Sequence, residues 1–138
     1  MYAKSPTVCL LSASVVRWLC TVAEIIVSPI NKTVTVGDYT RLICSTDGDI
    51  PVTWNKYEQN NTKIELYRLG QIHQDFRQRF AVSPAIRGQY NLEITNVQLA
   101  DEGIYECIDR TGNHSESVKA RLSIRPKCTA PQTPGSNH

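Results

Sequence analysis

The chain has 138 residues and is poor in the motifs that enzymes and metal sites require. It has three histidines, His73, His114 and His138. None belongs to an H-E-x-x-H motif or accompanies a motif-borne serine or cysteine nucleophile. No short cysteine or histidine spacing suits zinc either. We therefore expect no catalytic residue, no metal and no cofactor, and the protein is predicted not to be an enzyme.

The sequence also lacks a long apolar run and a real excess of charge. No stretch is long enough to cross a bilayer, so we expect no membrane span in this chain. Lysine and arginine number 15 against 13 acidic residues. Residues 1–23 hold Lys4 and Arg17 and no acid, so the charges balance without that segment. A near-neutral domain gives no reason to expect a nucleic-acid partner.

The two ends of the chain differ in composition from its middle. Residues 1–23 resemble a signal peptide, with Lys4 at the start, a short apolar run and small residues at 21–23. Arg17 interrupts the apolar run, and a retained N-terminal extension is the alternative. Residues 126–138 form a polar tail with three prolines, which we expect to be flexible. A single domain is predicted over 24–125.

Two distant cysteines enclose the most informative pattern. Trp54 follows Cys44 by ten positions, and Tyr105 lies two residues before Cys107 in the run D-E-G-I-Y-E-C. This spacing resembles the immunoglobulin superfamily, whose fold is an all-β sandwich of two antiparallel sheets. The resemblance implies a Cys44–Cys107 disulfide, with Trp54 packed on it and Tyr105 fixing the E–F corner.

A second pair refines the resemblance toward V-type domains. Arg79 and Asp101 look like the arginine and aspartate that bridge the base of V-set sandwiches, and we expect both to be buried and to have a structural role. The 25 positions from Trp54 to Arg79 leave room for strand C′ and a short C″. An I-type layout is the close alternative.

Alternating apolar residues predict the strands A to G in chain order. The first strand is expected to be split at Pro29. The predicted ranges are 25–28 and 33–36 for A, 39–45 for B, 52–57 for C, 64–68 for C′, 71–73 for C″, 79–83 for D, 89–95 for E, 103–109 for F and 118–124 for G.

A structural disulfide implies an oxidising compartment, so we expect the protein to be secreted or to be the ectodomain of a cell-surface protein. Cys9 and Cys20 would leave with the signal peptide, which makes Cys128 an odd cysteine. Such a residue often pairs between chains, so a homodimer linked through Cys128 is one of the readings that stay open. A capped thiol, or pairing in a longer isoform, is the alternative.

Three sequons predict N-glycosylation at Asn31, Asn60 and Asn113. All three fall in predicted loops. Asn60 lies at the C–C′ turn and Asn113 near the F–G tip, so glycans there would crowd the tips that antibodies use for antigen.

The outer G-F-C-C′ face is the predicted binding face. An apolar centre with a charged rim favours a protein partner. On C′, either Ile64 and Leu66 or Glu65 and Tyr67 face outward, and the pattern does not decide between them. The residues predicted to face outward are Thr53, Asn55, Tyr57, Ile104, Glu106, Ile108, Lys119 and Arg121.

The stretches from Gly88 to Thr95 and from Leu99 to Cys107 resemble the outermost domains of nephrin/Kirrel, lachesin, Dpr/DIP and IgLON proteins. Those families use the G-F-C-C′ face for homophilic or heterophilic contacts between cells. The resemblance implies cell recognition or adhesion. A secreted immune recognition, effector or decoy domain is the alternative. A rearranging antigen-receptor domain is less consistent, because no G-x-G bulge opens strand G.

Overall fold

The computed structural model describes residues 10–11, 18–19, 25–47, 51–83, 88–111 and 114–128. Within these residues all regular structure is β-strand apart from two short 3₁₀ helices, η1 (Gln74–Phe76) and η2 (Leu99–Asp101). Most of the predicted signal peptide and tail lie outside the described residues. Of residues 1–23, only β1 (Leu10–Leu11) and β2 (Trp18–Leu19) are described, and they pair with each other.

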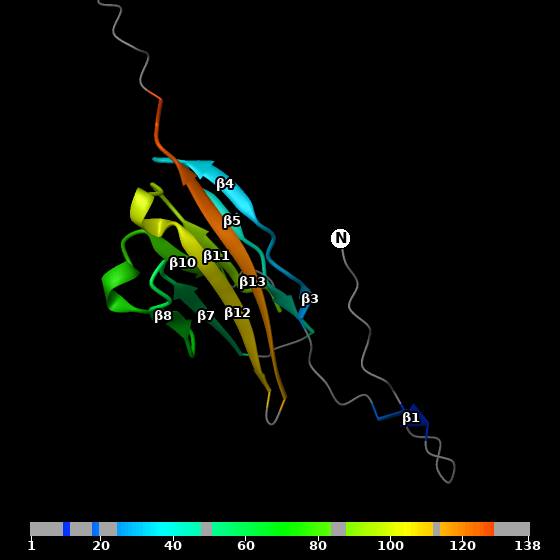
Figure 1. Cartoon of the computed structure of the whole chain (residues 1–138). Helices are drawn as coiled ribbons and strands as arrows, with labels where there is room; N and C mark the ends of the chain where they lie inside the picture. Colours follow the sequence, from blue (N-terminus) through cyan, green and yellow to red (C-terminus); the bar gives the residue numbers. More distant parts are fainter. Residues whose placement is uncertain are drawn as a thin grey trace, which may run out of the picture.

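The larger sheet has six strands in the order β4-β13-β12-β7-β8-β9 (Figure 1). In the family's letters, these strands are A′, G, F, C, C′ and C″. All neighbours are antiparallel except β4 and β13, which run parallel. The bounds are β4 (Lys32–Thr35), β7 (Val52–Tyr57), β8 (Lys63–Arg68), β9 (Gln71–Ile72), β12 (Gly103–Thr111) and β13 (His114–Arg125).

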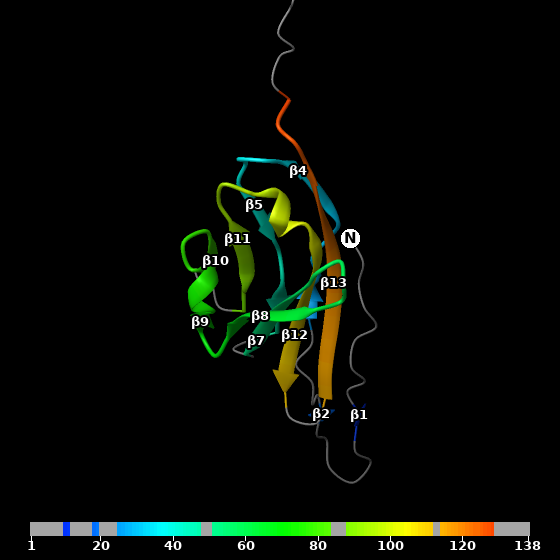
Figure 2. The same ribbon diagram turned by 60° about the vertical axis from the view of Figure 1, so that its left-hand side comes forward.

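The second layer consists of a three-stranded sheet, β10-β11-β5, and a two-stranded sheet, β3-β6. In Figure 2 the strands β5, β10 and β11 lie beside the layer that contains β12 and β13. The predicted strand B is interrupted around Cys44, whose carbonyl accepts a hydrogen bond from the Tyr90 N–H. The bounds are β3 (Ile25–Val27), β5 (Thr40–Leu42), β6 (Ser45–Thr46), β10 (Phe80–Ser83) and β11 (Asn91–Ile94).

The first strand changes sheets at the predicted position. β3 pairs with β6 in one layer, whereas β4 pairs with β13 in the other. Pro29, which is buried, lies in the segment between them. Because proline offers no N–H to a ladder, it suits a point where a strand leaves one sheet for another.

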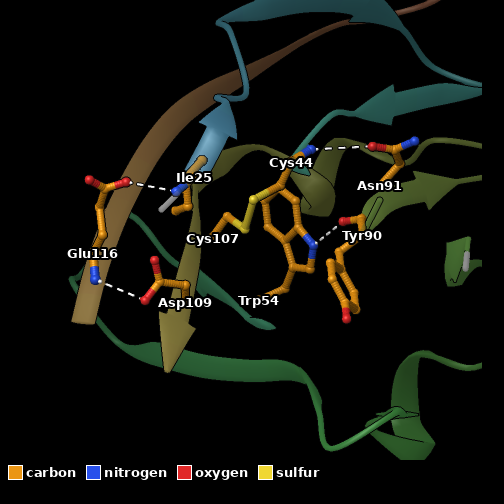
Figure 3. The surroundings of a disulfide bond; sticks show 8 residues. All are labelled: Ile25, Cys44, Trp54, Tyr90, Asn91, Cys107, Asp109 and Glu116. Atoms are coloured by element: carbon orange, nitrogen blue, oxygen red, sulfur yellow. Dashed lines mark hydrogen bonds between the residues drawn. A yellow bond between two sulfur atoms is a disulfide. The ribbon is translucent and has the colours of Figure 1, made fainter. Parts of the chain in front are cut away.

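The core lies between the layers and is centred on a disulfide. Cys44 and Cys107 are bonded, with their Cα atoms 6.5 Å apart. Trp54 is the register partner of Cys107 and is fully buried. Figure 3 shows its indole beside the disulfide, with Nε1 donating to the Tyr90 carbonyl at 2.7 Å. The hydrogen bond satisfies the only polar atom of the indole, so the ring can be buried without an unpaired donor.

One end of the sandwich is fixed by two polar contacts. The buried Tyr105 hydroxyl donates to the Asp101 carbonyl. The Asp101 carboxylate accepts from both terminal nitrogens of Arg79, at 2.6 and 2.8 Å, and from the Gln98 N–H at 2.7 Å. The Asp101 side chain is 5% exposed, but that of Arg79 is 28% exposed, so the expectation that both partners are buried is wrong for Arg79. The arginine lies in the turn before β10 and is half-buried.

Gly103, the glycine of the D-E-G-I-Y-E-C run, is needed because there is no space for a side chain at this position. A Cβ at Gly103 would lie 2.7 Å from the Tyr57 carbonyl oxygen on the neighbouring strand β7. Real Cβ atoms essentially never come that close to another atom. Only a residue without a side chain lets β12 start this close to β7.

The F–G hairpin is longer than predicted. Pairing continues past Asp109 to Thr111 on β12, and β13 begins at His114 rather than Val118. The Asp109 carboxylate accepts from the Glu116 N–H at 3.4 Å, and a Glu116 oxygen accepts from the Ile25 N–H at 3.0 Å (Figure 3). These polar side chains hold together a region where the apolar alternation has already ended.

Candidate protein-binding face

The predicted binding-face residues form three rows across the larger sheet. Their register pairs Tyr57 with Ile104 and Ile104 with Arg121 in the first row. The second row is Asn55, Glu106 and Lys119, and the third is Thr53, Ile108 and Ser117. Because side chains alternate along a strand, residues two apart share a face. All eight predicted residues therefore lie on the side of the sheet that faces away from the second layer.

Three of the eight are not available to a partner, which corrects the expectation that all of them are presented. Thr53, Asn55 and Glu106 are 3%, 1% and 6% exposed. They lie on β7 and β12, the two central strands of the six-stranded sheet. Tyr57, Ile104 and Ile108 are half-buried, whereas Lys119 and Arg121 are exposed. The accessible face is thus a half-buried apolar centre with a basic edge.

Glu106 lies beneath this surface and accepts hydrogen bonds from several neighbouring side chains. One carboxylate oxygen accepts from the Tyr57 hydroxyl at 2.7 Å and from the Asn55 Nδ2 at 3.4 Å. Burial alone would raise the pKa of Glu106. Hydrogen bonds from Tyr57, Asn55 and Ser117, together with the positive charge of Lys119, outweigh burial and lower this pKa. Glu106 is therefore a buried, ionised carboxylate with its partners supplied by the same face.

Tyr57 is held in place from two sides. Its hydroxyl donates to Glu106, and this bond, with burial and the nearby negative charge, raises the tyrosine pKa. The Lys119 ammonium lies over the ring, 5.0 Å from its centre. A cation over an aromatic face is attracted by the ring quadrupole. The ring is therefore preorganised, which lowers the entropy that a partner must remove on binding.

The open question on strand C′ is settled by a bulge. Glu65 is the register partner of Asn55 and is exposed, so it lies on the outer face, while Leu66 is fully buried. The register shifts between these positions, and Tyr67 becomes the partner of Trp54 and is buried with it. Glu65 and Tyr67 therefore do not share a face, because the bulge inserts an extra residue between them.

A shallow hollow of about 460 Å³ opens at the apolar centre of the face. A second hollow of about 450 Å³ continues toward the start of β12, and the two have several lining residues in common. The shared lining residues are Tyr57, Asn61, Ile104 and Arg121. Their combination of aromatic, aliphatic, amide and guanidinium groups is suited to a protein side chain.

Sequence reasoning missed Asn31 as part of this face. Asn31 precedes β4, and its Oδ1 accepts from the Arg121 N–H at 2.8 Å. It lines the larger hollow together with Tyr57 and Ile104. The only local signal was the sequon, which marks an exposed position without saying which surface it joins.

The remaining predicted sites lie elsewhere. Asn60 is exposed in the turn between β7 and β8, where its Oδ1 accepts from the Thr62 N–H. Asn113 is outside the described residues. Cys128 is exposed and has no disulfide partner within the part of the chain that the structure describes.

The described residues include neither a cluster of metal ligands nor a membrane-spanning helix. In that part of the chain, no three histidine, cysteine or acidic side chains gather as metal ligands would. It also contains no helix with the length and apolarity needed to cross a membrane.

Comparison with known proteins agrees with the fold. A family model described as the immunoglobulin V-set domain matches residues 27–125. The synaptogenesis protein syg-1 of Caenorhabditis elegans is 37% identical over 60 residues, which cover 41% of this chain and 8% of that protein. The matched stretch is thus less than a tenth of that relative's length.

A solved structure has the same architecture. The crystal structure of the RIG-5 IG1 homodimer is similar with a TM-score of 0.66 and 20% identity, covering 75% of this chain and 97% of that one. At this identity the similarity shows the fold. Because the family model spans well over half of the sequence and the disulfide, indole and tyrosine corner are in place, the chain belongs to the immunoglobulin V-set family.

Proposed function

We propose that the protein is an extracellular recognition domain that binds a protein partner through the outer face of the larger sheet. The observation that carries the proposal is the preorganised Tyr57 at the edge of a hollow, with Ile104 beside it and Lys119 and Arg121 on the rim. Aromatic and arginine side chains around a desolvated centre are the groups that contribute most to protein–protein affinity.

The burial pattern supports a protein partner over a small charged ligand. The one carboxylate on the inner part of the face, Glu106, already has its hydrogen bonds supplied by neighbouring side chains. The basic rim of Lys119 and Arg121 is exposed at one edge of the face, while the strand at the other edge carries both Lys63 and Glu65. Exposed charges around the apolar centre allow the face to meet a complementary surface and to steer the encounter.

Cell recognition or adhesion is the role that the relatives support. Syg-1 is a synaptogenesis protein, and the RIG-5 domain was solved as a homodimer. We extend both to this chain as part of the proposal: the partner is a second copy of the chain or another cell-surface protein. In a two-fold homodimer the same patch would lie on both subunits, so a single substitution would alter both sides of the contact.

The test is charge reversal on the rim of the face. Full-length protein is secreted from eukaryotic cells as wild type, Lys119→Glu/Arg121→Glu and the control Arg41→Glu, which alters an exposed arginine on the opposite sheet. Sedimentation velocity measures self-association, and staining of intact cells with a multimerised form measures binding to other surface proteins. We expect the double variant to lose binding at least about tenfold, while the control binds as wild type does.

Two results would contradict the proposal. One is binding that the double variant retains, with a melting temperature equal to that of the wild type. The other is no binding by any form in either assay, both with N-glycans present and after their enzymatic removal.

A further inference from the structure

Asn31 brings a modification site into the candidate binding face. Its side chain lines the hollow beside Tyr57 and Ile104 and is anchored by the hydrogen bond from the Arg121 N–H to Oδ1. Asn31-Lys-Thr33 is an acceptor sequon for N-glycosylation. Among the described residues none accepts a hydrogen bond from Nδ2 of Asn31, which is the atom that carries the sugar. Asn31 and Thr33 are both exposed, so a glycan can be accommodated on the folded domain.

We propose that a glycan on Asn31 covers the hollow and controls access to the binding face. The donor is a lipid-linked oligosaccharyl pyrophosphate of the secretory pathway. Asn31 Nδ2 bonds to the anomeric carbon of the first sugar and loses a proton. The bond from that carbon to the pyrophosphate oxygen breaks, and the lipid pyrophosphate leaves with the electron pair. This inference rests on the proposed function in so far as the face that the glycan covers is the binding face.

The starting point of the glycan is fixed by the fold. Because Oδ1 is bound to the backbone of β13, the amide cannot swing freely away from the sheet. The first sugar therefore begins at the wall of a hollow of about 460 Å³. An N-linked glycan is bulky and strongly hydrated. The centre of a protein interface excludes water and packs as densely as a protein interior, so a glycan there opposes docking.

The Asn60 sequon supplies a matched contrast. Asn60 lies in the same domain and is exposed, but it lines a depression beside Leu99 and Ala100. That depression shares Glu58, Gln59 and Glu102 with the second hollow and no residue with the hollow of about 460 Å³. Removing that sequon should leave the hollow unchanged. Thr62 carries no described side-chain hydrogen bond, so Thr62→Ala removes the sequon with little effect on the turn.

The experiment compares full-length chains secreted from one eukaryotic host. The forms are wild type, Thr33→Ser, which keeps the sequon, Thr33→Ala, which removes it, and Thr62→Ala. Peptide mass spectrometry measures occupancy at Asn31, and hydroxyl-radical footprinting measures oxidation of Tyr57 and Ile104. Sedimentation velocity measures self-association. Enzymatic removal of all N-glycans from the wild type, which converts each occupied Asn to Asp, gives a sugar-free face without a variant that has to fold.

We expect Asn31 to be occupied in wild type and in Thr33→Ser, with Tyr57 and Ile104 oxidised at least about threefold more slowly than in Thr33→Ala. Thr62→Ala should match the wild type. If the glycosylated wild type self-associates, Thr33→Ala and the deglycosylated wild type should self-associate at least about tenfold more tightly than it does.

An unoccupied Asn31, or an occupied Asn31 with the same oxidation rates in all forms, would overturn the inference. If footprinting shows the protection and no form binds a partner, the glycan covers the hollow as inferred and the proposed function is the part that fails.

Discussion

Replacing Arg79 by alanine tests how the base of the sandwich is held together. The substitution removes two hydrogen bonds to Asp101, at 2.6 and 2.8 Å, and two longer ones to the carbonyls of Thr95 and Asn96, at 3.5 and 3.3 Å. It leaves a carboxylate whose side chain is 5% exposed. The remaining partner of that carboxylate is the Gln98 N–H. The cost is therefore mainly the free energy of a buried charge that has lost its counter-ion.

The magnitude follows from the unequal burial of the two partners. Breaking one side of a fully buried ion pair costs about 3–5 kcal/mol, and an exposed pair contributes about 0–1 kcal/mol. The Arg79 side chain is 28% exposed, so water screens part of the attraction. We expect Arg79→Ala to lower the free energy of unfolding by about 2–3 kcal/mol, between these limits. For a domain of this size, that is a fall in melting temperature of roughly 10–20 °C.

Two companion variants separate the charge from the packing. Asp101→Asn can still accept from the Gln98 N–H and leaves Arg79 with access to water, so it should cost less than Arg79→Ala. The double variant should cost less than the sum of the two, because both single changes break the same pair. Arg68→Ala is the control, since Arg68 faces Glu65 at 3.9 Å with both side chains largely exposed. It should change stability by no more than about 0.5 kcal/mol.

Chemical denaturation followed by tryptophan fluorescence measures all four variants. The reasoning is refuted if Arg79→Ala and Arg68→Ala shift the midpoint equally, or if the two single costs at the base add without any coupling.

Three further predictions concern the core and the face. Replacing Cys44 and Cys107 by alanine should cost about 2–5 kcal/mol in thermal unfolding, and a variant as stable as wild type would contradict it. Gly103→Ala places a Cβ 2.7 Å from the Tyr57 carbonyl and should cost about 1–3 kcal/mol in urea denaturation; an unchanged midpoint would contradict the steric argument. Because the pKa of Glu106 is lowered in the folded state, its contribution to stability is present above its ordinary pKa and is lost as the pH falls through the folded value. Glu106→Gln should therefore flatten the acid side of the stability profile below about pH 4.5, and an identical profile would refute it.

The sequence alone determined the class of fold, and the prediction of an immunoglobulin V-type sandwich is confirmed. The reason is that its signals are local or of fixed spacing. Trp54 follows Cys44 by ten residues, and Tyr105 precedes Cys107 by two, because strand length and the period of two set these distances. The alternation of apolar residues also placed each strand within a few residues of its observed bounds.

Exposure on the face could not be predicted in the same way. The period of two assigns a residue to one side of a sheet, but exposure depends on the side chains of adjacent strands. Asn55 and Glu106 lie on the predicted side and are buried there by neighbours that are distant in sequence. Tyr67 is buried because the bulge brings it into register with Trp54. No pattern in the local sequence indicates this bulge.

Only the tertiary structure decided which residues share the hollow. Asn31 and Arg121 are 90 positions apart. They meet because the first strand passes from the second layer, where β3 lies, to the larger sheet, where β4 pairs in parallel with β13. Parallel strands are not joined by a short turn, so no fixed sequence spacing predicts this pairing. The sequence predicted Asn31 as a glycosylation site from its sequon, and the packing of two strands placed this asparagine beside Tyr57.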